Sequence, residues 1–182
     1  MAKHSIVRLD KVKATRTGHL YSVEHTEDMD NGSVVVLGDL KTGETEIKEV
    51  IVPEGTDEPL ALIYQAELMY DETKISSRAL ENFYNPANVA TRAYQLDTDD
   101  IYSVTTDGID AIVSGEPVVG NFLVAQAGSL KLKEVATVTG TEVFVGKVID
   151  REKIGTGANV GQAGVISRVM DLVVIEVKRN HK

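Results

Sequence analysis

Short runs of alternating apolar and polar residues recur along the chain, separated by turn-forming residues. Near the C-terminus, Val173, Ile175 and Val177 would share one face of a strand, because successive side chains of a strand point to opposite sides. Turn signals such as Asn31-Gly32 interrupt these runs. The pattern predicts a mostly β fold built from antiparallel β-sandwich or barrel elements. The final strand, 165–178, is long enough that we expect a break near Met170.

A short helix is predicted around residues 76–85. Ser76 or Ser77 can cap its start, and a small apolar stripe follows. Asn85 ends it, because the residue before a proline avoids the helical region. A helix of this length depends on packing for its stability.

The chain divides into three regions by charge and pattern. Residues 1–17 form a basic N-terminal arm, residues 18–100 an acidic β-rich region containing the short helix, and residues 101–182 a compact β-barrel-like domain. We place the boundary between the last two within 95–110. A chain of 182 residues can bury a core of its own in either one large domain or two small ones.

The net charge of −9 is unevenly distributed. Residues 1–110 carry 21 acidic and 10 basic side chains, a balance of −11, whereas residues 111–182 carry 7 and 9, a balance of +2. This acidity argues against nucleic acid as a partner. The absence of any apolar run of about 18 residues argues against a membrane partner, and the N-terminus has no signal-peptide pattern, so we expect synthesis in a cytoplasm.

Glycine-rich segments invite a search for cofactor sites, and none fits. Residues 140–147 resemble a phosphate loop, but five residues separate the glycines where the motif has four, and Val148 stands in place of the hydroxyl ligand. Residues 155–161 have the wrong spacing for a dinucleotide fingerprint. The chain contains no cysteine and no nucleophile elbow. We therefore expect no catalysis and no cofactor.

Acidic turns leave one metal option open. They could be solvated turns, or they could bind calcium weakly at the surface, although the flanking β pattern and ligand spacing do not match an EF-hand. No firm metal site is predicted. The acidic candidates are Asp28, Asp30, Asp97, Asp99 and Asp100.

The basic arm is the candidate for binding a partner. It could add a strand to a neighbour's sheet edge, or it could lie along the protein's own acidic surface. On the first alternative, its deletion should leave the fold intact. The candidate partner-binding residues are Lys3, Ile6, Val7, Arg8, Lys11, Lys13 and Arg16.

The order of features in residues 110–182 carries a family resemblance. Residues 116–121 (Glu-Pro-Val-Val-Gly-Asn) open a strand, residues 144–151 (Phe-Val-Gly-Lys-Val-Ile-Asp-Arg) follow a turn, and a valine-rich strand at 172–177 closes the segment. This resembles the small β-barrel or sandwich proteins that decorate the heads of tailed bacteriophages. The resemblance implies a virion protein on the capsid surface that binds the major capsid protein, self-associates, stabilises the shell and needs no cofactor.

Two other classes remain open. The chain could be another virion component, such as a head–tail connector, tail-tube or baseplate protein, and a long hydrophobic hairpin would favour a tail tube. It could instead be a carbohydrate- or cell-surface-binding module. An aromatic content of 5% with no tryptophan counts against the latter, because sugars commonly stack on exposed aromatic rings.

Overall fold

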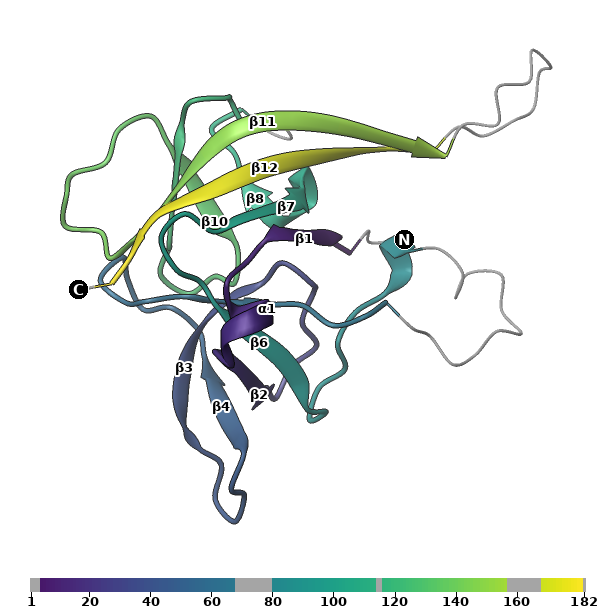
Figure 1. Cartoon of the computed structure of the whole chain (residues 1–182), viewed down its shortest axis with the longest axis vertical. Coiled ribbons are helices and arrows are strands. Elements are labelled where there is room, and N and C mark those ends of the chain that lie inside the picture. The colour runs from purple at the N-terminus through teal and green to yellow at the C-terminus, as the bar shows by residue number, and fades with distance from the viewer. Residues whose placement is uncertain (1–3, 68–79, 114–115, 157–167, 182) are drawn as a thin grey trace.

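The computed structural model describes residues 4–67, 80–113, 116–156 and 168–181, and its strands form two sheets (Figure 1). One sheet closes into a barrel, and the other has seven strands with β1 and β8 at its edges. The barrel strands, in spatial order, are β2 (Leu20–Glu24), β4 (Ile47–Ile51), β3 (Val34–Leu40), β5 (Ala61–Ile63) and β6 (Thr91–Gln95). The sheet strands, in spatial order, are β1 (Val7–Lys11), β7 (Ile101–Thr105), β12 (Arg168–Asn180), β11 (Phe144–Thr156), β9 (Phe122–Val124), β10 (Leu132–Val135) and β8 (Ile109–Asp110).

The prediction of a mostly β fold with little helix is confirmed. Most neighbouring strands are antiparallel, and the β2–β4 and β8–β10 pairs are parallel. The described helical elements are α1 (Ala14–Thr17) and the short 3₁₀ turns η2 (Leu80–Asn82) and η3 (Thr106–Gly108).

The predicted helix does not extend to Asn85. Its first residues, 76–79, lie outside the described part of the chain, and η2 is the helical turn that follows. Asn85 instead forms a β-bridge with Met29, with backbone N–H···O distances of 2.9 and 2.7 Å. The extended backbone that this bridge requires ends the helical conformation before Asn85.

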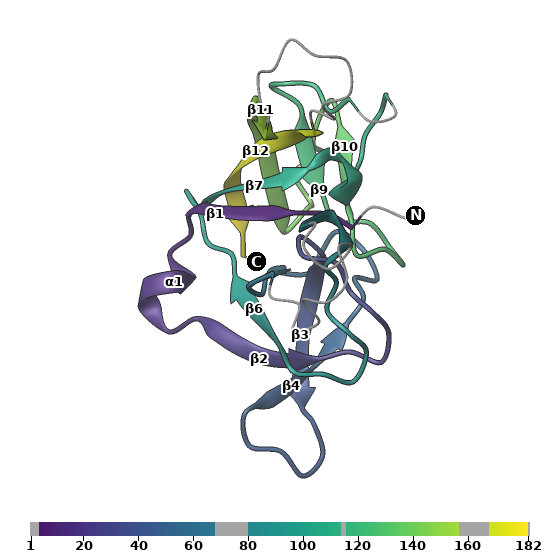
Figure 2. The same cartoon turned by 90° about the vertical axis from the view of Figure 1, so that its right-hand side faces the viewer.

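The barrel and the seven-stranded sheet pack against one another through a shared core. Alternation along β3 sends Val34 into this core and Val35 into the barrel interior. Leu62 of β5 lies in the shared core with Val104 and Ile175 of the sheet. Both layers therefore contribute to this shared core, and Figure 2 shows the sheet and the barrel one above the other.

Gly32 lies where the barrel approaches the sheet. Its φ of +89° is in the left-handed region, and a Cβ there would lie 2.7 Å from Val104 Cγ2 and 2.9 Å from Val7 Cγ2. Glycine supplies both the backbone conformation and the space that this approach needs.

The three regions predicted from the sequence map onto the barrel and the sheet as follows. The closed barrel is formed by strands within residues 20–95, whereas a barrel-like domain was expected over residues 101–182. Those later strands belong to the seven-stranded sheet, which also takes β1 from the N-terminal arm. The chain passes from one layer to the other between Gln95 and Ile101.

The longest strands, β11 and β12, are 13 residues each and form one antiparallel pair. The expected break near Met170 is absent, since β12 is continuous from Arg168 to Asn180. The irregularities lie along β11, where the register shifts between Val145 and Gly146 and between Val148 and Asp150. Such shifts bend and twist a strand without ending it.

Candidate partner-binding surface

Residues 111–113 and 116–121, which we call the aliphatic loop, are organised by the buried side chain of Glu134 on β10. One carboxylate oxygen accepts a hydrogen bond from the backbone N–H of Ile112 at 2.9 Å. The other accepts bonds from the Val118 N–H at 2.8 Å and the Asn121 side-chain amide at 2.6 Å. Glu134 therefore holds the two ends of the loop together.

The ionised form of Glu134 is favoured despite its position. Burial acts to raise the pKa of this carboxyl, but hydrogen bonds from Val118, Ile112 and Asn121 outweigh it and leave the pKa below its usual value. A charged carboxylate with several N–H donors is a rigid anchor, because charge-assisted hydrogen bonds are stronger than neutral ones.

The loop that Glu134 anchors presents aliphatic side chains to solvent. Four of them are about half exposed: Ile112 at 59%, Val113 at 56%, Val118 at 49% and Val119 at 52%. Single exposed aliphatic residues are common, but four in one anchored loop give a partner several apolar side chains to cover.

The strand expected to open at residues 116–121 begins later. β9 starts at Phe122, and the preceding residues form a turn in which the Asn121 N–H donates to the Val118 carbonyl at 3.1 Å. The backbone N–H of Val118 is occupied by Glu134, so it is not available to a sheet partner.

Sequence reasoning missed Glu134, although a signal for it exists. Alternation along β10 places Glu134 on the same face as Leu132, and both are buried. A carboxylate at a buried-face position requires hydrogen-bond donors nearby. Which loop would supply those donors depends on contacts distant in sequence.

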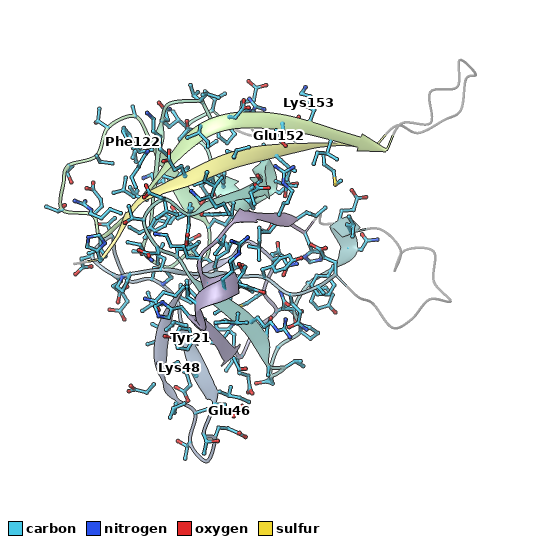
Figure 3. All side chains as sticks on the ribbon, viewed as in Figure 1. Tyr21, Glu46, Lys48, Phe122, Glu152 and Lys153 are labelled. Atoms are coloured by element: carbon cyan, nitrogen blue, oxygen red, sulfur yellow. The ribbon has the colours of Figure 1, made fainter. Side chains whose placement is uncertain are left out.

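The second feature of this surface is the projecting end of the β11–β12 hairpin, visible at the upper right of Figure 1. β7 pairs with β12 from Leu172 to Glu176, and β9 pairs with β11 at Gly146 and Lys147. Beyond those contacts the two strands pair only with each other among the described residues. Figure 3 labels Glu152 and Lys153 on β11; Glu152 lies opposite Leu172, the first β12 residue that pairs with β7, and Lys153 lies on the projecting side of it.

The outer part of β11 and the start of β12 carry charged side chains beside apolar ones. Lys153 lies 3.8 Å from Asp171 on the paired strand, and Glu152 lies 2.9 Å from the guanidinium of Arg8 on β1. The charges alternate along β11 from Asp150 to Lys153. A charged surface of this kind keeps an extended hairpin soluble.

The basic arm is built into the sheet edge. β1 pairs with β7, and Val7 is only 4% exposed, within the shared core. Val7 is therefore not available to a partner in this conformation. Lys3 lies outside the described residues, whereas Ile6 is half-buried and its N–H donates to Thr105 Oγ1 at 3.0 Å.

Two basic side chains of the arm make contacts within the chain. The Arg8 guanidinium pairs with Asp10 and with Glu152, and hydrogen bonds to these carboxylates raise its pKa. The Lys13 ammonium lies 3.1 Å from Asp97, and this hydrogen bond raises the pKa of Lys13.

The remaining arm residues, Lys11 and Arg16, are exposed. The ion pairs of Arg8 and Lys13 are of the kind expected if the arm lies along the protein's own acidic surface. The arm's role in binding a partner stays a prediction for Lys11 and Arg16.

The acidic candidates for calcium are held by separate interactions. Asp28 accepts the Ala87 N–H at 2.8 Å, and Asp30 lies 2.6 Å from the His4 ring nitrogen. Both line a pocket of about 400 Å³ between the barrel and the sheet.

The second acidic turn is tied to the start of α1. Asp100 accepts the backbone N–H of Lys13 at 2.9 Å, while Asp97 binds the Lys13 ammonium. Burial raises the pKa of Asp100, and the hydrogen bond from Lys13 lowers that of Asp97. Asp99 has a positive φ of 68° in this turn. Within the described ranges, no cluster of three or more acidic, histidine or cysteine side chains is arranged to hold a metal ion.

None of the described helices is long and apolar enough to cross a membrane. No family model, curated protein or solved structure matches this chain.

Proposed function

We propose that this protein is a non-catalytic structural component of a virus particle, and specifically that it binds and stabilises the outer surface of a tailed-phage capsid. The sequence resemblance in residues 110–182 points to that class. The observation that carries a binding role is the anchored aliphatic loop beside a projecting hairpin. Both lie within residues 111–182, where acidic and basic side chains nearly balance.

The position of these features supports attachment through one end of the molecule. The barrel and its β3–β4 hairpin lie at the opposite end from β11–β12 in Figure 1. Acidic side chains predominate in the first 110 residues, which supply all the strands of the barrel at that far end. A near-neutral surface with exposed aliphatic side chains can dock without long-range repulsion.

The experiment uses the particles encoded by the same genome as this chain. Purified virions are analysed by mass spectrometry for the chain, and shells assembled without it are then mixed with the purified full-length protein. We expect the chain in virions, cosedimentation with shells at a saturable stoichiometry, and a higher shell melting temperature. Virions that lack the chain, or shells that do not bind it, would contradict the proposal.

The length of the β11–β12 hairpin favours a second candidate, a tail-tube or related virion subunit that forms sheets between copies. Each strand has 13 residues, which is long enough to reach a neighbour. Charged side chains from Asp150 to Lys153 interrupt the apolar residues on its outer strand, however, and this is why we rank the capsid surface first. Electron microscopy of the concentrated chain distinguishes the two, because a tube subunit would assemble into rings or tubes without a shell.

A further inference from the structure

We propose that the outer edge of β11, residues 149–156, is a strand-addition site that takes an extended segment of the shell protein. This inference rests on the proposed function for the identity of the partner. We call these residues the free β11 edge. The site would be completed by the aliphatic loop, which lies at its base.

The first support is the pattern of backbone pairing. On its outer side, β11 is paired up to Val148, whose carbonyl accepts the Gly120 N–H at 2.8 Å and whose N–H donates to the Asn121 carbonyl at 3.0 Å. Beyond Val148, no described strand pairs with this side. The alternate N–H and C=O groups of the free β11 edge therefore point outward, where an extended segment can hydrogen-bond to them.

The second support is the limited stability of a projecting two-stranded ribbon. Two strands without a third or a covering layer are marginally stable in water. The β12 residues before Leu172, 168–171, and the β11 residues opposite them have no third described strand beside them. A bound segment would supply the third strand and fix the hairpin.

The third support is continuity between the edge and the aliphatic loop. Gly120 and Asn121, which end the loop, are bonded directly to Val148 at the start of the edge. An added strand would therefore pass beside the exposed Val118 and Val119. Main-chain hydrogen bonds would supply affinity, and an apolar side chain resting on these valines would fix the register.

The charges on the edge define the segment that fits. Alternation places Asp150 and Glu152 on one face of β11 and Arg151 and Lys153 on the other. Glu152 is already paired with Arg8, and Lys153 with Asp171, so within the described structure Asp150 and Arg151 lack an oppositely charged partner. A complementary segment has a basic residue opposite Asp150 and an acidic residue opposite Arg151.

The same charges disfavour a second copy of the chain as the occupant. In an antiparallel pair of identical strands related by a two-fold axis, the numbers of two opposed residues differ by an even amount. Each residue therefore lies opposite its own copy or opposite a residue from the same face of the strand. If the two-fold axis passes beside Arg151, Arg151 lies opposite its own copy and Asp150 lies opposite Glu152. If the axis passes beside Glu152, Glu152 lies opposite its own copy and Arg151 lies opposite Lys153. Like charges directly opposite one another destabilise both of these registers.

The test compares hydrogen–deuterium exchange of the full-length chain, free and bound to shells assembled from the major shell protein of the same genome. Strand addition predicts slower exchange in 149–156 on binding, with little change in the β3–β4 hairpin. Val119→Asp and Arg151→Glu should each weaken shell binding by roughly tenfold or more. The matched control, Leu40→Asp, changes a residue that is 52% exposed on the barrel and should bind within about twofold of the parent.

Three outcomes would overturn the inference. Binding to shells with unchanged exchange in 149–156 would reject the strand-addition site while leaving the proposed function standing. Protection of 149–156 in the free chain that grows with protein concentration would identify a second copy as the occupant. No binding to shells at all would reject the proposed function and this inference with it.

Discussion

The side chain of Asn180 pairs with both backbone polar groups of Leu60, joining the end of the sheet to the barrel. Its Oδ1 accepts the Leu60 N–H at 2.7 Å, and its Nδ2 donates to the Leu60 carbonyl at 2.7 Å. The same amide also donates to the Leu96 carbonyl at 2.7 Å. One buried side chain thus connects β12 to the segments that enter β5 and leave β6.

Replacing Asn180 with alanine should therefore destabilise the whole fold. Three buried backbone groups would lose their partner, and each unsatisfied group costs about 1–3 kcal/mol, partly relieved by water. We expect the free energy of unfolding to fall by about 2–4 kcal/mol, measured by urea denaturation. Lys178→Ala, at an exposed position on the same strand, is the control and should change it by less than about 0.5 kcal/mol.

Glu134→Gln should release the aliphatic loop while the two sheets stay folded. The neutral amide presents an N–H group where the carboxylate accepted bonds from Ile112 and Val118, so at least one contact is lost. We expect a loss of about 1–3 kcal/mol and faster amide exchange at Ile112 and Val118. Glu116→Gln, at an exposed position in the same loop, is the control. Unchanged exchange in the loop would show that Glu134 does not anchor it.

Tyr102→Phe should stabilise the protein. The Tyr102 hydroxyl is buried without a hydrogen-bond partner among the described residues, and burial raises the pKa of this phenol. Removing the hydroxyl eliminates the cost of desolvating it, so we expect a gain of about 1 kcal/mol in unfolding free energy. Tyr21→Phe is the control, because the Tyr21 hydroxyl donates to Gln95 at 3.3 Å and its removal should bring no gain. A loss of stability in Tyr102→Phe would indicate a partner, such as a buried water.

Acid should remove the contribution of Glu142 to stability. Its carboxylate accepts hydrogen bonds from the Thr139 N–H, the Gly140 N–H and the Thr139 hydroxyl, and the backbone bonds lower its pKa from 4.5 to about 2. A carboxyl whose pKa is lower in the folded than in the unfolded protein stabilises the fold at pH values above its unfolded pKa. This contribution is lost as the pH falls through its folded pKa. Glu142→Gln should therefore melt a few degrees lower than the parent at pH 7, and this difference should close between about pH 4.5 and about pH 2. A difference independent of pH would assign the effect to packing.

The local pattern of apolar and polar residues was sufficient to predict buried strands, but it was not sufficient to predict the candidate partner-binding surface. The alternation at Val173, Ile175 and Val177 predicted a buried strand face, and all three are buried in the shared core. The helical turn η2 ends at Asn82 rather than at Asn85, because a bridge from Asn85 to Met29, distant in sequence, requires extended backbone. The aliphatic loop could not be found because Val118 and the residues after it read as a strand until the Glu134 contact is known.

The basic arm is a second case in which the local sequence was not sufficient to predict the candidate binding residues. Its charge and terminal position predicted a binding segment, and nothing in the local sequence indicates that β7 pairs with it. Val7 contacts the shared core, and the register Val7↔Val104 is a contact across most of the chain. Such pairing follows from the topology rather than from the composition of the segment.

Deleting residues 2–17 should consequently destabilise the fold, in contrast to the expectation for an independent arm. The deletion removes β1 and the buried side chains of Val7 and Val12, and it exposes the edge of β7. Burying a valine contributes about 1.5–3 kcal/mol, so the two valines alone account for several kcal/mol of a typical 5–15 kcal/mol total. The measurement is thermal unfolding of the deletion variant followed by circular dichroism.

A second variant separates the arm's structural role from a binding role. Exchanging the exposed Lys11 and Arg16 for glutamate leaves β1 and its buried side chains in place while reversing the charge of the arm. If the arm also contacts an acidic partner, this variant should keep its melting temperature and bind shells more weakly at low salt, with the difference shrinking as salt screens the charges. Unchanged shell binding at low salt would leave the arm with its structural role alone, because Arg8 and Lys13 already pair with acids of the same chain.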